Sequence, residues 1–148
     1  MLTGHFRGKP LGCGTDVWRF VDDGESTARA LEYVRAAPDG IAVYSGNDIE
    51  FADFVRASGT GAVSGVSSVF PRPFVALADA LRRGDEQAAA AAQDRVKRAV
   101  EAVAGADIAL IKAGLALRGL PAGPPRVALD PPSPAQLDTL RAAIEELT

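Results

Sequence analysis

Residues 41–73 of this chain read IAVYSGNDIEFADFVRASGTGAVSGVSSVFPRP, and this stretch decides the fold class. Its first apolar run, residues 41–44, ends abruptly at the polar segment SGND, which is typical of a turn and a helix cap in one. A second apolar run, residues 61–66, ends at two serines before a helix that prolines open. Two consecutive strand–helix units with small polar residues at the strand ends predict a parallel α/β sheet whose site lies at that edge.

The composition describes one globular domain and excludes several classes of partner. The chain has 148 residues, 47% of them hydrophobic and 24% charged, which is enough for a hydrophobic core. Its net charge is −3 and no basic cluster is dense enough to follow a phosphate backbone, so we expect no nucleic-acid partner. No apolar run approaches the roughly 20 residues that span a bilayer, and the N-terminus lacks the apolar core of a secretory signal.

The chain has one cysteine, Cys13, and one histidine, His5. A single cysteine excludes an internal disulfide and fits a reducing cytoplasm, where we expect the protein to reside. A single histidine excludes a multi-histidine metal centre, and we expect neither a metal nor a cofactor. Nothing in this glycine-rich terminus fixes the thiol beside a base, so we do not expect a cysteine nucleophile.

Outside the opening stretch the pattern is mostly helical. We expect a strand at 17–21 and a helix at 25–37, with a short helix at 48–57 between the two apolar runs. Four further helices are predicted at 71–83, 86–103, 106–118 and, after a proline-rich connector, 134–147. The predicted inward residues are Phe74, Ala78 and Leu81 in the first of these, Val96, Val100 and Val103 in the second, and Ile108, Ile111 and Leu115 in the third. Ser133 and Pro134 are predicted to cap and open the last helix.

Other residue groups have simple structural explanations. Gly59, Gly61 and Gly65 are spaced G-x-G-x-x-x-G with the first two before the strand, which does not match a phosphate-binding loop and indicates turns. The carboxylates at 22–25 have no partner lysine or histidine nearby and indicate a solvated loop with a helix cap. Lys112 lies on a late helix, where a structural role is the better interpretation.

Several short motifs, taken in order, resemble those of the dihydrodipicolinate synthase / N-acetylneuraminate lyase family. Residues 45–48 resemble the Ser-Gly-Asp-Asp-like loop that typically ends that family's seventh strand. Residues 61–71 resemble its eighth-strand pattern, Gly-Val-Ile-Ser-x-x-x-Asn-x-x-Pro. The later segments LRRGD at 81–85, IKAGLALRG at 111–119 and RVAL with PPS between 126 and 133 resemble the family's glycine–aspartate break, its "vKaaLallG" helix and its "R.PL.PLs" connector.

The resemblance covers roughly residues 22–148 and implies a class I aldolase on a (β/α)₈ TIM barrel. The predicted fold is therefore α/β. Residues 21–83 form the last two or three strand–helix units of such a barrel, residues 84–148 a C-terminal helical subdomain, and residues 1–20 an irregular segment unlike the family. Members are lyases that act on 2-keto acids, usually pyruvate, or on sugar acids, and synthase, aldolase and dehydratase subtypes remain open here. The implied substrate-binding residues are Ser45, Gly46, Asn47, Asp48, Val63 and Ser64.

The family's central residue is missing from its expected position. The resemblance implies a Schiff base on a lysine about two dozen residues before the Ser-Gly loop, and Val21 stands 24 residues before Ser45. Valine cannot form an imine, so no catalytic residue is assigned. The nearest upstream lysine, Lys9, precedes a proline where the family has an aspartate. We expect a C-terminal half whose first 20 residues come from an altered gene start or another reading frame, a hypothesis that genomic sequence upstream tests.

Three functions stay open for such a chain. It is a lyase that acts only with the missing half, a catalytically silent fragment, or a small-molecule binding or assembly module that keeps residues 45–48. A parallel sheet of two or three strands leaves open edges, because only a closed barrel removes them. We therefore expect self-association, or pairing with a polypeptide that supplies the missing strands.

Overall fold

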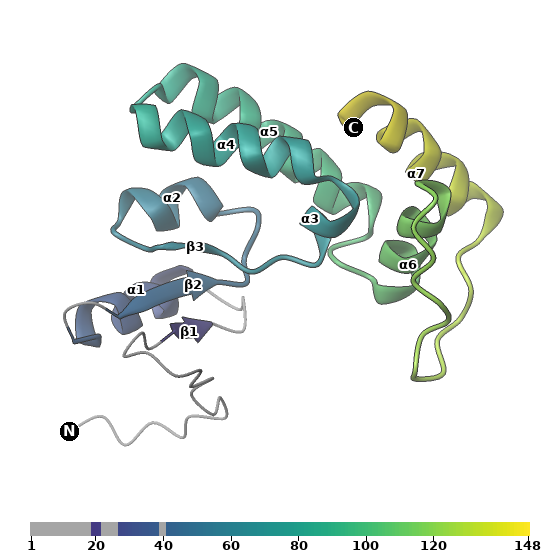
Figure 1. Cartoon of the computed structure of the whole chain (residues 1–148), viewed down its shortest axis with the longest axis horizontal. Coiled ribbons are helices and arrows are strands. Elements are labelled where there is room, and N and C mark those ends of the chain that lie inside the picture. The colour runs from purple at the N-terminus through teal and green to yellow at the C-terminus, as the bar shows by residue number, and fades with distance from the viewer. Residues whose placement is uncertain (1–18, 22–26, 39–40) are drawn as a thin grey trace. The chain divides into compact units, whose positions relative to one another are not determined.

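The computed structural model describes residues 19–21, 27–38 and 41–148, and these form two compact units (Figure 1). The first unit ends at Val63 and the second begins at Ser64. The units therefore divide ahead of the boundary at 83/84 that the sequence suggested. The reason is that the helix ending at Arg83 packs along the helix that follows it, in the second unit. The predicted irregular segment falls almost wholly outside the described residues, as do Cys13, His5 and the carboxylates at 22–25.

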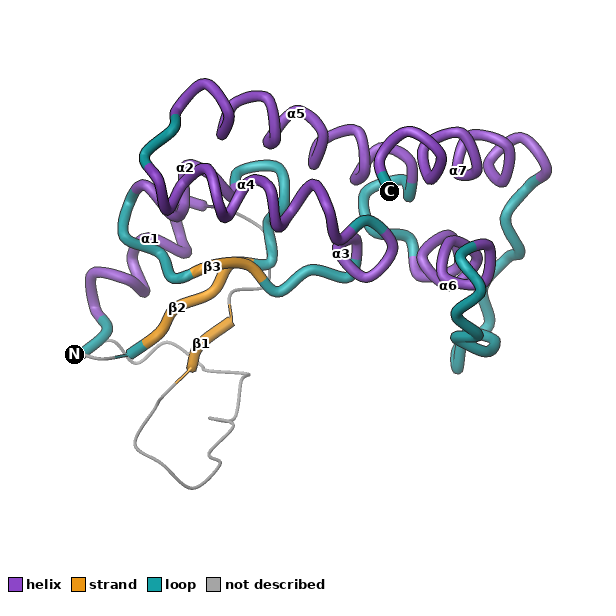
Figure 2. Tube along the Cα trace, turned by 45° about the horizontal axis from the view of Figure 1, so that its top comes forward, coloured by secondary structure: helices purple, strands orange, loops and turns teal. Residues whose placement is uncertain are grey.

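The first unit is a three-stranded parallel sheet with two helices. Its strands are β1 (Arg19–Val21), β2 (Ala42–Ser45) and β3 (Gly61–Ala62), in the spatial order β1-β2-β3. Two helices connect them, α1 (Thr27–Ala36) and α2 (Phe51–Arg56). This βαβαβ order confirms the parallel α/β arrangement, and the three strands lie side by side in Figure 2. Among the described residues, β1 and β3 each have a strand neighbour on one side only.

The core of the first unit lies on the helix side of β2. Val43 packs with Ala30 of α1 and Phe54 of α2, and all three side chains are buried. Thr60 extends the pairing of β2 beyond β3, because its N–H donates to the Val43 carbonyl (2.8 Å) and its hydroxyl accepts from the Val43 N–H (3.0 Å). Gly59, interpreted from the sequence as a turn residue, also makes a close approach. A Cβ there would lie 2.2 Å from a ring carbon of Phe54.

The strand predicted at 61–66 is shorter than expected. β3 ends at Ala62, and residues from Val66 already belong to a short helix, α3 (Val66–Val69). A local hydrogen bond explains the early end, since the Ser64 hydroxyl accepts from the N–H of Ser67 (3.0 Å) and so turns the backbone towards a helix.

The second unit consists of α3 and four longer helices. These are α4 (Pro71–Arg83), α5 (Glu86–Ala102), α6 (Ile108–Leu117) and α7 (Pro134–Leu147). α4 and α5 lie side by side in both views, joined by Gly84 in the left-handed conformation that a helix C-terminus favours (Figures 1 and 2). Ser133 caps α7 through a capping box with Gln136, as the Ser-Pro pair predicts.

Burial confirms some of the predicted helix faces and corrects others. In α5 and directly after it, Val96, Val100 and Val103 are buried as expected. In α4 the buried residues include Phe74, Leu77 and Ala80, whereas Ala78 and Leu81 are only half-buried. The predicted face of α6 is wrong at its first residue, because Ile108 is exposed while Ile111 and Leu115 are half-buried. The residues of α6 that are buried are Ala109, Leu110 and Gly114.

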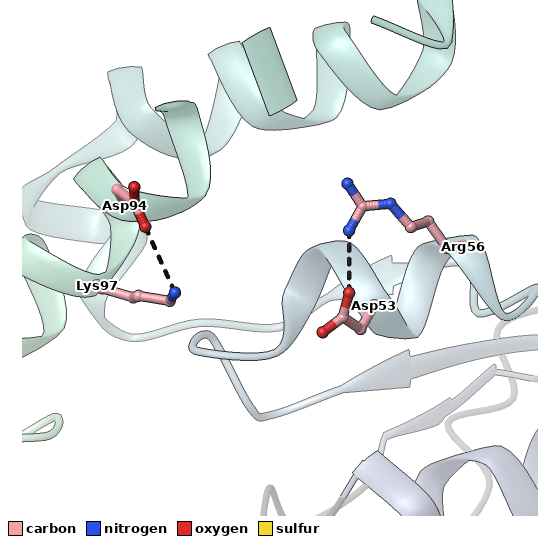
Figure 3. Close-up of polar contacts among 4 residues, drawn as sticks. All are labelled: Asp53, Arg56, Asp94 and Lys97. Atoms are coloured by element: carbon pink, nitrogen blue, oxygen red, sulfur yellow. Dashed lines mark hydrogen bonds and ion pairs between the residues drawn. The ribbon is translucent and has the colours of Figure 1, made fainter. Parts of the chain in front are cut away.

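Neighbouring charges of opposite sign stabilise the outer faces of the helices. Asp53 accepts from Arg56 on α2 (2.9 Å) and Asp94 pairs with Lys97 on α5 (3.4 Å), each three residues apart (Figure 3). Such exposed pairs contribute about 0.3–0.5 kcal/mol each, so they support helices that packing already holds.

Candidate ligand site at the strand ends

The segment after β2 is a turn built from its own polar side chains. Ser45 is fully buried, and its hydroxyl accepts a hydrogen bond from the Asn47 N–H (3.0 Å). Asn47 in turn accepts from the Ile49 N–H through its side-chain oxygen (3.1 Å) and donates to the Glu50 carboxylate (3.3 Å). Two successive side-chain turns of this kind explain why a serine and an asparagine stand two residues apart after the strand.

The predicted helix cap in this segment is wrong. α2 begins at Phe51 with Glu50 at the N-cap position, and no side chain caps it. Asp48 is nevertheless buried, with 7% of its surface exposed, and its backbone carbonyl accepts from the Phe51 N–H (3.4 Å). The side chains of these polar residues therefore stabilise the turn that precedes α2, and they do not cap the N-terminus of the helix.

The ends of β2 and β3 meet at the residues that the sequence singled out. The Val63 N–H donates to the Ser45 carbonyl (2.9 Å), which joins the first implied segment to the second. The Val63 side chain is 54% exposed. Ser64 begins the second unit, where its carbonyl accepts from the Ser67 hydroxyl (2.9 Å). Hydrogen bonds thus bring Ser45, Asn47 and Val63 together, and Ser64 interacts with the start of α3.

Tyr44 carries a polar hydroxyl, but the sequence analysis treated it only as part of the apolar run 41–44. The register pairs Tyr44 with Val21 on one side and with Gly61 on the other. Tyr44 is half-buried between the buried Val43 and Ser45, so its side chain leaves the opposite face of β2. Strict alternation along residues 42–45 was the signal that could have singled it out.

The described lysines are both in the second unit and both are engaged. The Lys112 ammonium donates to the carbonyls of Ala122 (2.8 Å) and Gly123 (3.4 Å), which supports the structural interpretation of this residue. Lys97 pairs with Asp94 on the surface of α5. Across the described residues, no group of three or more His, Cys, Asp and Glu side chains is placed to hold a metal ion. No helix in this part of the chain is long and apolar enough to cross a membrane.

A parallel sheet whose strands are connected by helices places the first unit in the class of α/β proteins. Within that class, the chain belongs to the dihydrodipicolinate synthetase family, whose model matches residues 21–147. The family resemblance inferred from the motifs is thereby confirmed, and with it membership of a family of lyases and aldolases.

Curated relatives support the same assignment. The chain is 37% identical to a 4-hydroxy-tetrahydrodipicolinate synthase of Exiguobacterium sp. over 110 residues, which are 74% of this chain and 38% of the relative. It is 33% identical to the enzyme of that name from Symbiobacterium thermophilum over 118 residues, or 78% of this chain and 40% of the relative. The chain thus spans about two fifths of the length of these relatives.

Solved structures agree at the level of the fold. Dihydrodipicolinate synthase DapA-2 from Bacillus anthracis matches with a TM-score of 0.78 at 23% identity, over 88% of this chain and 45% of that one. A putative dihydrodipicolinate synthase from Thermus thermophilus matches with a TM-score of 0.72 at 27% identity, over 85% of this chain and 45% of that one. The described residues are helix-rich with a small sheet, and they resemble less than half of each of these proteins.

Proposed function

We propose that this chain is the C-terminal part of a (β/α)₈ barrel of the family. In this proposal it carries the strand-end segments that bind a 2-keto acid such as pyruvate, but it does not form the Schiff base itself. The family match over residues 21–147 supports the first part, and the contact between the ends of β2 and β3 supports the second. Because the Ser45 hydroxyl is buried in its own turn and Asp48 is also buried, the segment would meet a ligand through the backbone at Gly46 and through Asn47.

The main support for the absence of imine chemistry is the residue at position 21. Val21 is the last residue of β1 and occupies the position that the family resemblance gives to the lysine. Its backbone pairs with Tyr44 in the middle strand, one residue before the Ser-Gly turn. The sequence contains no lysine between Lys9 and Lys97, so β1, β2 and β3 carry no amine.

The remaining described lysines are poor substitutes. An imine-forming lysine must offer a neutral amine with a free electron pair to the keto carbon. The Lys112 ammonium uses its hydrogens on two carbonyls, and Lys97 pairs with a carboxylate three residues away. Both nitrogens are therefore already engaged in contacts within the second unit.

The proposal is tested by borohydride trapping with pyruvate, followed by intact-mass and peptide mass spectrometry. Because the chain has only three lysines, Lys9, Lys97 and Lys112, any adduct can be placed on one of them. We expect no adduct in the wild-type protein, together with saturable binding of ¹³C-pyruvate measured by NMR. An adduct concentrated on one of the three would overturn the view that the chain lacks this chemistry, and absence of saturable binding would overturn the binding role.

A matched variant, Val21→Lys, supplies the missing amine at the end of β1. We expect borohydride and pyruvate to give an adduct at position 21 in this variant, because the backbone there pairs with Tyr44 beside the proposed site. Val43→Lys is not a suitable control, since Val43 is in the core, whereas Val75→Lys adds an amine on an exposed position of α4. Equal labelling of the Val21→Lys and Val75→Lys variants would contradict a keto acid site at the strand ends.

The open edges of the sheet favour association with a further polypeptide. β1 and β3 each present one backbone edge without a strand partner among the described residues, and such edges readily pair with other strands. We propose that copies of the chain self-associate, or that a chain carrying further barrel strands completes the site and restores lyase activity. Sedimentation velocity at micromolar concentration tests the first alternative, and a clean monomer would contradict it.

A further inference from the structure

The connector between α6 and α7 is an exposed segment with apolar side chains, called the arm below. The arm comprises residues 119–132, which precede the capping residue Ser133, and Figure 1 shows it as a narrow loop that projects away from the two helices. Val127 is 62% exposed, the largest fraction among the exposed large hydrophobic side chains that the structure describes, and Leu129 is 45% exposed. The described part of the chain thus leaves the apolar side chains of the arm largely in solvent.

The arm is stiff and is anchored near both ends. The Lys112 ammonium donates to the carbonyls of Ala122 (2.8 Å) and Gly123 (3.4 Å), and the capping box of Ser133 and Gln136 holds the other end. Five residues of the arm are prolines, which fix the backbone dihedral φ. A segment that is already ordered loses little conformational entropy when it docks, and this favours binding.

The same compact unit has an open hollow that fits an aliphatic side chain. The hollow lies where the end of α5, the start of α6 and the first turns of α7 meet, and its volume is about 200 Å³. Its lining includes the buried Ala102 and Leu110 and the exposed Ala104 and Ala135. A cavity of about 150 Å³ with an apolar lining is enough to bind benzene, so this hollow can take the side chain of a valine.

The hollow and the arm carry complementary charges. Two polar residues of the lining, Gln136 and Thr139, are already bonded within α7 and its cap. The third, Glu101, is exposed and has no ion pair with another described residue. Arg126, which precedes Val127 in the arm, is likewise exposed and forms no ion pair within the described ranges. A guanidinium beside the apolar side chain of the arm can therefore meet a carboxylate at the hollow.

We propose that the arm of one copy docks in the hollow of a second copy, with Val127 in the hollow and Arg126 paired with Glu101 of the partner subunit. Each copy carries one arm and one hollow, so the contact is reciprocal and gives a dimer with two-fold symmetry. This inference rests on the proposed self-association, and it assigns the contact to the helical unit instead of the open edges of the sheet.

Sedimentation velocity of the full chain over a range of concentrations measures the association. We expect the wild-type protein to form dimers, and Val127→Ser to raise the dimer dissociation constant about ten-fold or more, because an apolar anchor is lost from both contacts. The matched control is Val75→Ser, which changes a valine on α4 that is 58% exposed and lies outside the arm. This control should leave the dissociation constant unchanged, and circular dichroism checks that each variant is folded.

Charge reversal tests the ion pair. Arg126→Glu and Glu101→Arg should each weaken the dimer about ten-fold, because like charges then meet at both contacts. The double variant restores opposite charges and should recover most of the lost affinity. Glu145→Arg makes the same change of charge at an exposed position of α7 outside the hollow, so it serves as the matched control.

Chemical coupling locates the contact. Arg126→Lys supplies an amine that a carbodiimide joins to a neighbouring carboxylate, and mixing ¹⁴N-labelled with ¹⁵N-labelled copies distinguishes links between copies from links within one copy. We expect mass spectrometry to find a mixed-isotope link between position 126 and Glu101.

The possible outcomes separate this inference from the proposed self-association. A wild-type protein that stays monomeric overturns both. A dimer that Val127→Ser and both charge reversals leave unchanged overturns docking of the arm, and leaves self-association through the sheet edges standing. A double charge reversal that fails to restore the dimer overturns the pairing of Arg126 with Glu101. Links to Glu101 without any mixed-isotope species overturn the exchange of arms between copies.

Discussion

Replacing Gly59 by alanine should destabilise the first unit, although the change adds a single methyl group. The new Cβ would lie 2.2, 2.4 and 2.5 Å from three ring carbons of Phe54, against an ordinary carbon contact of about 3.5–4.0 Å. The Phe54 ring is fully buried and packs against Ala30 and Val43, so it must move by about 1 Å into occupied space. Overpacking of this kind costs about 1–3 kcal/mol and occasionally more, and we expect a value of about 3 kcal/mol.

The neighbouring glycine provides the control. A Cβ at Gly61 would lie 3.5 Å from the Tyr44 ring, which is ordinary contact, so Gly61→Ala should change the stability by less than about 1 kcal/mol. Combining Gly59→Ala with Phe54→Leu removes the ring atoms that the methyl group meets. The double variant should therefore be less destabilised than the sum of the two single changes.

Hydrogen exchange read by mass spectrometry measures this effect locally. Peptides that cover β2 and α2 should lose protection in Gly59→Ala, and peptides from α5 in the other compact unit serve as an internal reference. Urea unfolding followed by circular dichroism gives the corresponding free energy. A Gly59→Ala protein within about 0.5 kcal/mol of the wild type, with unchanged exchange in β2, would refute the close approach of Phe54.

Two predictions concern the helical unit. Gly114→Ala would place a methyl group 2.7 Å from a side-chain carbon of the buried Val69. We therefore expect the free energy of unfolding, measured in urea, to fall by about 1–3 kcal/mol. Adding Val69→Ala makes room for the methyl group, so the double variant should be less destabilised than the sum of the two single variants, and additive losses would contradict the close contact. Ala106 has a φ of 88°, a backbone conformation that favours glycine and strains alanine. Ala106→Gly should therefore increase the free energy of unfolding by about 1 kcal/mol and raise the midpoint of thermal unfolding. A lowered midpoint would contradict the presence of this strain.

The sequence was sufficient wherever short-range chemistry decides the structure. The run 41–44 followed by SGND predicts the strand β2 and its turn, because the serine and asparagine side chains bond to backbone within two residues. The same holds for the end of α4 at Gly84 and for the capping box of Ser133 and Gln136. The motif order was also enough to identify the family and to show that position 21 carries valine.

Other features depended on contacts between segments that are distant in sequence. Periodicity alone could not predict that α6 buries Ala109 and Gly114 and exposes Ile108, because packing against the neighbouring helices determines which face is buried. The role of Gly59 needs the position of the Phe54 ring, and the position of Tyr44 between Val21 and Gly61 needs the register of the sheet. The sequence by itself determined the local elements and the family. Only the tertiary structure decided which residues face each other, because register and burial depend on non-local packing.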